Sequence, residues 1–246
     1  MKILKIFLIS LVGLMPAHGA DYQPKQPIEK ISKGMSPVER SIRSAAVRVS
    51  PPGGGHGSGS IIKYKDVNLV ITAQHVADKP LGTNYLISKN ANGEGIIATL
   101  IHSSTTHDIA VLYLPESQDP ASIGAAPMDW EPTSKYEIGT NIFYSGYPSH
   151  HQLMSFDGRI AGYEEEPGSG TQLIVNTFGW FGCSGSVIFN TKGKIIGVLY
   201  GVDVEYYPSI QVNENMIWVA PIRALNIKDA IKPFCRGTVR NHRACR

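Results

Sequence analysis

The stretch Leu69-Val70-Ile71-Thr72-Ala73-Gln74-His75-Val76 joins an apolar segment directly to a histidine. Residues 69–72 have the β-branched composition of a buried strand, and glycine-rich segments at 53–55 and 57–59 lie before it. A histidine at the end of a strand can be aimed into a cleft by the turn that follows. For a single histidine among eight, a core or surface position is the simpler explanation, so this motif needs partners elsewhere in the chain.

Two further motifs supply such partners. In His107-Asp108-Ile109-Ala110-Val111-Leu112-Tyr113-Leu114, an acid opens a buried strand, although a lone aspartate there is also explained as a turn cap. In Gly182-Cys183-Ser184-Gly185-Ser186, glycines flank a serine between two expected strands. A nucleophilic serine needs such a tight turn, with backbone N–H groups that converge on an oxyanion. Turns of Gly and Ser are common, so this motif is also weak by itself.

Outward from these motifs, the chain is a series of short strands punctuated by turn residues, which favours a sandwich or barrels. The stretch 115–134 contains Pro and Ser and interrupts the series, so we interpret it as a linker between two halves. One helix is expected at 221–231, with Pro221 in its first turn and Pro233 ending it. The expected strands are 46–49, 60–64, 69–72, 84–87, 95–101 and 109–114 in the first half, and 141–144, 158–163, 173–177, 186–189, 194–200 and 216–219 in the second.

The first twenty residues predict export. An apolar run spans residues 6–15, with Lys2 and Lys5 at its start and a segment containing small residues at 17–20 after it. This is the pattern of a cleaved signal peptide. A retained N-terminal anchor is the alternative, but the run is short for a membrane span. We therefore expect a secreted or periplasmic protein with no membrane association after signal removal. The formal net charge of +3 falls to +1 without the two lysines, and no basic stripe supports nucleic-acid binding.

Three cysteines remain after the signal segment. Cys235 and Cys245 lie close together near the C-terminus and could pair in an oxidising compartment, which leaves Cys183 unpaired. No Cys/His spacing is typical of a zinc site, so we expect no metal and no cofactor.

The three motifs together are more specific than any one of them. They follow the order His75, Asp108, Ser184, with separations of 33 and 76 residues, and each lies at the edge of an expected strand. In this the chain resembles the trypsin-like serine peptidases, whose Thr-Ala-x-His, Asp-Ile/Leu-Ala and Gly-x-Ser-Gly segments it matches. The Gly-x-Ser-Gly-Ser form is similar to that of bacterial glutamyl endopeptidases. The resemblance covers roughly residues 44 to 231.

The resemblance implies an all-β fold of two antiparallel six-stranded β-barrels with a C-terminal α-helix, and the triad between the barrels. It implies a serine endopeptidase with a protein or peptide substrate. The chain would divide into a signal peptide (1–20), a lead-in (21–43) that is loosely ordered over 21–39, an N-terminal barrel (44–120), a C-terminal barrel plus helix (133–231) and a basic tail (232–246). The oligomeric state is left open.

The resemblance also implies roles for single residues. Ser184 would attack the scissile carbonyl, His75 would move its proton, and Asp108 would orient the imidazole. The N–H groups of Gly182 and Ser184 would form the oxyanion hole, and Tyr200 and Gly201 would pair with the substrate backbone.

Three departures from the family pattern concern specificity and activation. Phe178 stands where trypsin has an acid, so a preference for Arg or Lys is not expected. Leu199 lies, within one residue, where glutamyl endopeptidases have a glutamate-binding histidine, which leaves apolar or small side chains as the expectation. Cys183 replaces the aspartate of digestive proteases, so their zymogen switch cannot operate here.

Other interpretations remain. An α/β-hydrolase is disfavoured because residue 186 is Ser and the motif order is wrong. A protease fold without activity, which acts as a binding or scaffold protein, keeps all three residues and is not excluded. The tail after Pro233 is explained as a solvated terminus or as a basic docking module. Cys183 is a possible nucleophile, but only Ser184 has glycines both two residues before it and directly after it.

Overall fold

The structure is a computed structural model that describes residues 30–91, 94–206 and 209–236. The expected signal peptide, the first part of the lead-in and Cys245 lie outside these residues. None of the described helices is long and apolar enough to cross a membrane.

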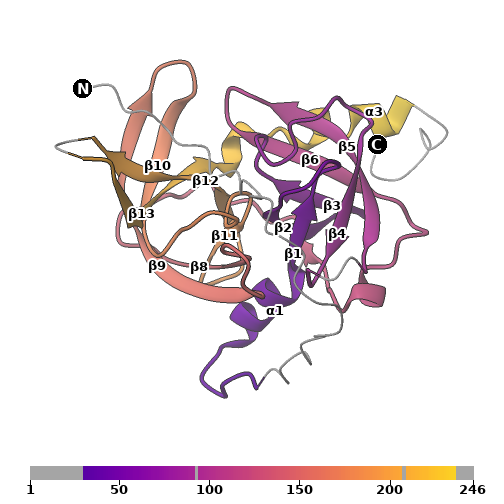
Figure 1. Cartoon of the computed structure of the whole chain (residues 1–246), viewed down its shortest axis with the longest axis horizontal. Helices are drawn as coiled ribbons and strands as arrows, with labels where there is room; N and C mark the ends of the chain where they lie inside the picture. Colours follow the sequence, from indigo (N-terminus) through magenta and orange to yellow (C-terminus); the bar gives the residue numbers. More distant parts are fainter. Residues whose placement is uncertain (1–29, 92–93, 207–208, 237–246) are drawn as a thin grey trace, which may run out of the picture.

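The first half of the chain forms a closed antiparallel barrel, barrel 1, drawn from indigo to magenta in Figure 1. Its strands lie in the order β1-β4-β5-β6-β3-β2, and pairing of β1 with β2 closes it. In the β3–β6 pair, Thr72 lies opposite Ala110, so the end of β3 and the start of β6 meet at one rim. This register brings the turns that carry His75 and Asp108 together. The strands are β1 (Ala46–Ser50), β2 (Gly57–Tyr64), β3 (Val67–Thr72), β4 (Asn84–Ser88), β5 (Ile96–Ser104) and β6 (Ile109–Leu114).

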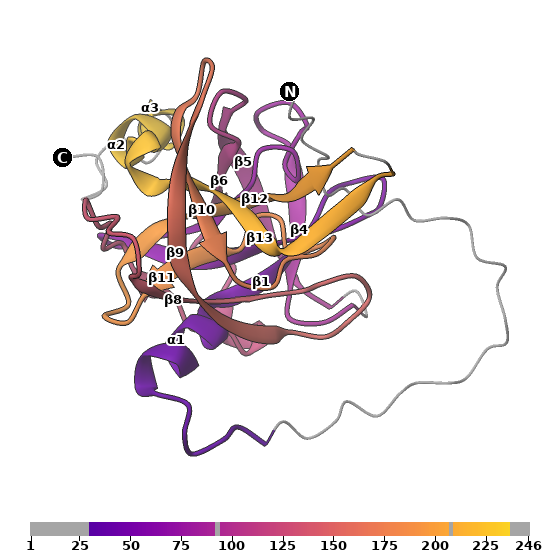
Figure 2. The same cartoon turned by 90° about the vertical axis from the view of Figure 1, so that its left-hand side faces the viewer.

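The second half forms another closed six-stranded barrel, barrel 2, in the order β10-β13-β12-β11-β8-β9. Figure 2 faces this barrel and shows the long β9 curving along it. The two-barrel fold class expected from the sequence is therefore confirmed. The strands are β8 (Asn141–Gly146), β9 (Met154–Glu166), β10 (Gly170–Asn176), β11 (Val187–Asn190), β12 (Ile195–Glu205) and β13 (Gln211–Pro221).

Two apolar clusters form the core. One fills the interior of barrel 2 and includes Cys183, Leu199 and Val219. The other fills barrel 1 and continues to Ile174, Tyr200 and Trp218 of barrel 2. Since β-strand side chains alternate between faces, barrel 2 contributes one set of residues to its own interior and the other set to the contact with barrel 1. The two barrels are thus packed together through the second cluster.

A helix that was not expected, α1 (Pro37–Ala45), precedes barrel 1 and packs against β8 and β2. Ser36 and Glu39 form a capping box, and Pro37 stands in the first turn. The interpretation of 21–39 as loosely ordered is therefore wrong from Ser36 onward. The prolines in this segment pointed to a loop, whereas Pro37 lies where a helix needs no N–H donor.

The C-terminal helix is three short pieces rather than one: η2 (Ile222–Ala224), α2 (Ile227–Ala230) and α3 (Lys232–Arg236). They lie against barrel 1, where the ring of Phe234 is 4.5 Å from that of Tyr113 between centroids. Pro233 does not end the helix as expected, because it is the second residue of α3, where its missing N–H is not needed. The expected linker contains η1 (Pro120–Ile123) and β7 (Met128–Asp129), which pairs with β2 in parallel.

Candidate active site

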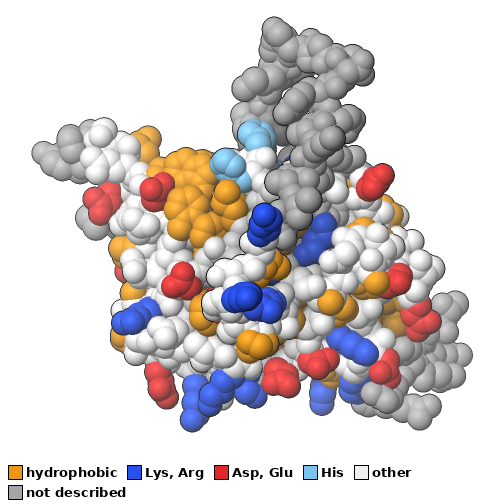
Figure 3. All heavy atoms as spheres, turned by 90° about the horizontal axis from the view of Figure 1, so that it is seen from below, with side chains coloured by type: hydrophobic (Ala, Val, Ile, Leu, Met, Phe, Trp, Pro, Cys, Tyr) orange, Lys and Arg blue, Asp and Glu red, His pale blue; other side chains and the backbone are white. Residues whose placement is uncertain are grey.

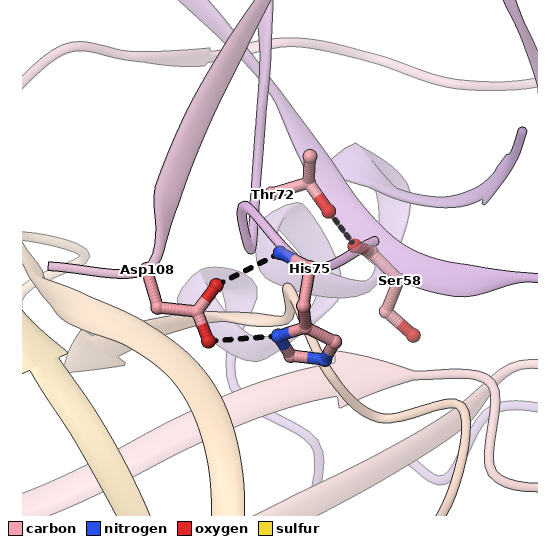
Figure 4. Close-up of polar contacts among 4 residues, drawn as sticks. All are labelled: Ser58, Thr72, His75 and Asp108. Carbon is pink, nitrogen blue, oxygen red and sulfur yellow. Dashed lines mark hydrogen bonds and ion pairs between the residues drawn. The ribbon is translucent and has the colours of Figure 1, made fainter. Parts of the chain in front are cut away.

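His75 lies in the turn that follows β3 and is buried. Its Nδ1 is 2.7 Å from Oδ2 of Asp108, and its backbone N–H donates to Oδ1 of the same carboxylate at 2.9 Å (Figure 4). Both carboxylate oxygens of Asp108 therefore bind the same residue, His75. Because Oδ2 accepts, Nδ1 carries the proton and Nε2 is the ring nitrogen left to act on another group.

Asp108 reaches His75 from the residue before β6. Its φ angle is 51°, in the left-handed region that aspartate tolerates better than most residues. This local turn points the carboxylate back across the barrel rim towards His75. Two other acids of the first half of the chain are not placed this way: Asp66 is exposed, and Asp78 is exposed and pairs with Lys79.

Ser184 lies in the turn between β10 and β11, in a segment held tightly against barrel 1. Gly185 has a φ of 90°, and a Cβ added to it would lie 2.1 Å from the carbonyl oxygen of Ser58. Only glycine fits there. The carbonyl of Ser184 accepts a 2.7 Å hydrogen bond from the backbone N–H of Ser58. The side chain of Ser184 is fully buried, and its Oγ makes no hydrogen bond with any described residue, His75 included.

The expected oxyanion-hole donors are left unused by the fold. The N–H groups of Cys183, Gly185 and Ser186 donate to the carbonyls of Trp180, Leu199 and Cys183. Neither Gly182 nor Ser184 donates its N–H to a described residue. Gly182 has a φ of 90°, which turns the chain so that alternate N–H groups point to different sides. Within the described part of the chain these two N–H groups have no acceptor, so both could donate to a bound oxygen atom.

The residues expected to bind substrate lie on both sides of Ser184 along the chain. Phe178 is half-buried, its ring stacks on Phe156, and its carbonyl accepts the hydroxyl hydrogen of Tyr144. Tyr200 and Gly201 lie in β12 beyond Val198, the last residue of β12 that pairs with β11. From there on, one edge of β12 has no strand partner among the described residues, so an extended peptide could add to it.

Tyr200 shows that this edge is close to negative charge. Burial raises the pKa of its hydroxyl, and the carboxylates of Glu166, Asp108 and Glu164 raise it further. Leu199, by contrast, is fully buried inside barrel 2.

Cys183 lies in the interior of barrel 2, as expected for a sulfur that packs rather than reacts. Burial raises the pKa of its thiol to about 11. Its Sγ is 3.9 Å from the hydroxyl of Tyr144. Cys235 is disulfide-bonded; Cys245, with which it was expected to be able to pair, lies outside the described residues.

Sequence reasoning missed two buried residues that surround the serine segment, His56 and Ser58. Nε2 of His56 donates to the carbonyl of Tyr147 at 3.1 Å, and it would lie 2.8 Å from a Cβ placed on Gly182. Burial and the charge of Arg48 lower the pKa of His56 to about 4. The glycines around both residues indicated only a turn, and their partners lie some ninety or more positions away.

The surface around the barrels carries mixed charge. On the face in Figure 3, hydrophobic side chains gather in one patch beside histidines, with Lys, Arg, Asp and Glu spread over the rest. Within the described ranges, no group of three or more His, Cys, Asp or Glu side chains is arranged to hold a metal ion.

Comparisons with known proteins identify the family to which the chain belongs. A family model described as "Trypsin-like peptidase domain" matches residues 57–198, which include His75, Asp108 and Ser184. A glutamyl endopeptidase of Staphylococcus epidermidis is 28% identical over 176 residues, covering 67% of this chain and 61% of that protein. One of Staphylococcus aureus strain MW2 is 24% identical over 185 residues, covering 69% and 54%. The chain thus spans about three fifths, or less, of the length of these relatives.

Solved structures show the same fold. The active form of the Rv3671c protease of M. tuberculosis superposes with a TM-score of 0.59 and 17% sequence identity, covering 80% of this chain and 83% of that one. Its inactive form gives 0.58 and 18%, with coverages of 80% and 92%. At this identity the likeness concerns the arrangement of strands alone.

Proposed function

Because the chain belongs to the trypsin-like peptidase domain family, we propose that it is a serine endopeptidase that cleaves peptide bonds through an acyl-enzyme intermediate. One observation supports this most strongly: His75 is held through its ring and its backbone by a single carboxylate, that of Asp108. Such a pair orients an imidazole as a general base, and the serine of the family's Gly-x-Ser-Gly turn lies in the same matched region.

In the proposed mechanism, Ser184 Oγ attacks the carbonyl carbon of the scissile bond while Nε2 of His75 takes its proton. Asp108 keeps the proton of Nδ1 in place and stabilises the imidazolium that forms. The N–H groups of Gly182 and Ser184 bind the oxyanion of the tetrahedral intermediate. His75 then gives its proton to the leaving amine, and water releases the acyl group by the same steps in reverse order.

The nucleophile is proposed to be Ser184 and not Cys183. A thiol reacts as its thiolate, and the burial that raises the pKa of Cys183 to about 11 keeps it protonated near neutral pH. Cys183 also belongs to the apolar interior of barrel 2.

For the residue that precedes the cut, we propose an apolar or small side chain. Phe178 brings no charge to the position where an acid would select Arg or Lys. Leu199, buried inside barrel 2, has no imidazole to bind a glutamate side chain. We further propose that the chain acts outside the cytoplasm, on the strength of the export pattern at its N-terminus.

The test is cleavage profiling on a diverse peptide library with purified protein. We expect cuts after apolar or small residues, and none with the Ser184→Ala variant. A second candidate function, a binding protein without catalysis, is favoured by the lack of a hydrogen bond between Ser184 Oγ and His75. It predicts no cuts with either protein. In peptidases without substrate this bond is often long, which is why catalysis remains the better proposal.

A further inference from the structure

Ser58 belongs to barrel 1 but bonds to the two segments of barrel 2 that surround the proposed nucleophile. Its Oγ donates to the carbonyl of Gly182 at 2.7 Å and accepts from the backbone N–H of Tyr147 at 2.9 Å. Its own N–H donates to the carbonyl of Ser184 at 2.7 Å. The residue is fully buried, and these distances are those of well-formed hydrogen bonds.

The carbonyl of Gly182, which accepts from Oγ of Ser58, sets the shape of the oxyanion site. It belongs to the peptide between Gly182 and Cys183, which lies between the two proposed donors, the N–H groups of Gly182 and Ser184. A peptide unit is planar, so fixing its carbonyl fixes how the chain on either side is turned. Gly182 itself resists rotation little, because glycine is free to adopt many φ angles. Two bonds hold this peptide: its N–H, that of Cys183, donates to the carbonyl of Trp180 inside the segment at 2.9 Å, and its carbonyl accepts from Ser58 outside the segment.

Ser58 also ties this segment to the strand that leads to the histidine. The hydroxyl of Thr72, the last residue of β3, donates to the carbonyl of Ser58 at 2.7 Å (Figure 4). Gly59 pairs with Thr72 in the β2–β3 ladder, so β2 and β3 are in fixed register there. His75 follows Thr72 by three residues. The position of the oxyanion segment is thus set relative to the histidine through Ser58.

We propose that Ser58 is a positioning residue, which holds the Gly182–Cys183 peptide so that the N–H groups of Gly182 and Ser184 converge on the carbonyl oxygen of the substrate. This role rests on the proposed function and goes beyond it. Ser58 touches neither the substrate nor the reacting atoms. It acts in the transition state, through the two donors that it orients.

The test compares Ser58→Ala with Ser60→Ala. Ser60 lies two residues along β2, is equally buried, and makes no side-chain hydrogen bond with residues 178–186 of the described structure. With a peptide chosen from the cleavage profile, we expect Ser58→Ala to lower kcat by about 10- to 100-fold, somewhat less than the loss of a whole oxyanion donor. We expect KM to change by less than about threefold, because ground-state binding does not use these donors.

A second measurement separates positioning from simple destabilisation. A peptide aldehyde of the same sequence forms a tetrahedral adduct with the serine, and its affinity should fall in step with kcat in Ser58→Ala, whereas that of the product peptide should not. Ser58→Cys fills the site with a slightly larger side chain that is only a weak donor, and it should show the same pattern if Ser58→Ala does not fold.

The outcomes are distinguishable. If the wild type cleaves peptides and both Ser58 variants match Ser60→Ala in kcat and in aldehyde affinity, Ser58 is only a structural tie and the proposal is wrong. The same conclusion follows if KM rises as much as kcat falls while the aldehyde binds normally. If the wild type cleaves nothing, the proposed function is wrong, and the role given to Ser58 is wrong with it.

Discussion

Asp108 is the residue whose chemistry is most sharply defined by its contacts. Its two oxygens receive the Nδ1–H and the backbone N–H of His75. In Asp108→Asn, the amide keeps the shape but no longer favours the Nδ1-protonated tautomer. We therefore expect kcat to fall by about 10⁴-fold with little change in folding. Steady-state kinetics with thermal unfolding checks this.

The matched control for Asp108→Asn is Asp78→Asn. Asp78 is an exposed acid that pairs with Lys79, so its substitution should leave kcat unchanged. Activity of Asp108→Asn within about threefold of wild type would mean that another acid orients His75, since the expected effect is far larger.

His56 should make the folded state sensitive to acid. The pKa of His56 is lowered to about 4 by burial and by Arg48, with a smaller effect of His150, while an unfolded histidine titrates near 6.5. Below pH 6.5 the unfolded chain therefore takes up a proton that the folded chain does not. The contribution of neutral His56 to the free energy of unfolding is fully present above pH 6.5 and is lost as the pH falls towards 4.

Urea unfolding at several pH values measures this loss. Carboxylates also titrate in this range, so the informative quantity is the difference between the wild type and His56→Gln, whose amide can still donate to the carbonyl of Tyr147. The wild type should lose more stability between pH 6.5 and 4 than the variant. Parallel curves of unfolding free energy against pH for the two proteins would show that His56 takes up no proton on unfolding.

At this scale the sequence predicted His75, Asp108 and Ser184, because each stands in a local motif at the edge of a strand. Ser58 and His56 could not be predicted in the same way. Their partners Gly182 and Tyr147 are 124 and 91 positions away, and only the closed barrels bring them together. Short polar residues among glycines give no local signal of such contacts.

Among the elements, the strands were predictable and their ends were not. Alternating and β-branched segments identified twelve strands, but β9 and β12 extend well beyond the expected 158–163 and 194–200. The extensions of β9 pair with β8 at its start and with β10 at its end, and that of β12 pairs with β13, which local composition does not specify. The helix α1 was missed because its prolines suggested a loop, although Ser36 and Glu39 are a capping signal.

The capping box of α1 gives a test at this scale. Oγ of Ser36 accepts from the N–H of Glu39, whose carboxylate accepts from the N–H of Ser36. Ser36→Ala should lower the free energy of unfolding by about 1 kcal/mol, the usual value of an N-cap. Since Ile42 of α1 is buried in the core, this loss should appear in global urea unfolding.

Ser41→Ala is the control, because Ser41 is an exposed residue within the same helix whose hydroxyl donates to the carbonyl of Pro37 and to no other described residue. Equal stability of Ser36→Ala and wild type would indicate that α1 unfolds independently of the barrels.

For the whole molecule, the fold works by bringing distant turns together where the two barrels meet. Barrel 1 supplies His75, Asp108 and Ser58, and barrel 2 supplies Gly182 and Ser184. The family resemblance, which the order of the three motifs carries, made this architecture predictable, whereas the series of short strands favoured only a sandwich or barrels. What composition could not define is how tightly the barrels are joined, since that depends on a shared core and on buried hydrogen bonds such as those of Ser58.

The central claim is that Ser184 is a nucleophile activated by His75. The measurement is covalent labelling by a fluorophosphonate, with the modified residue located by mass spectrometry and the rate compared across variants. We predict one adduct, on Ser184, absent in Ser184→Ala, formed at least about 100-fold more slowly in His75→Ala, and unaffected in Cys183→Ala. No adduct on Ser184, together with loss of cleavage on alkylating Cys183 and in Cys183→Ser, would contradict the account.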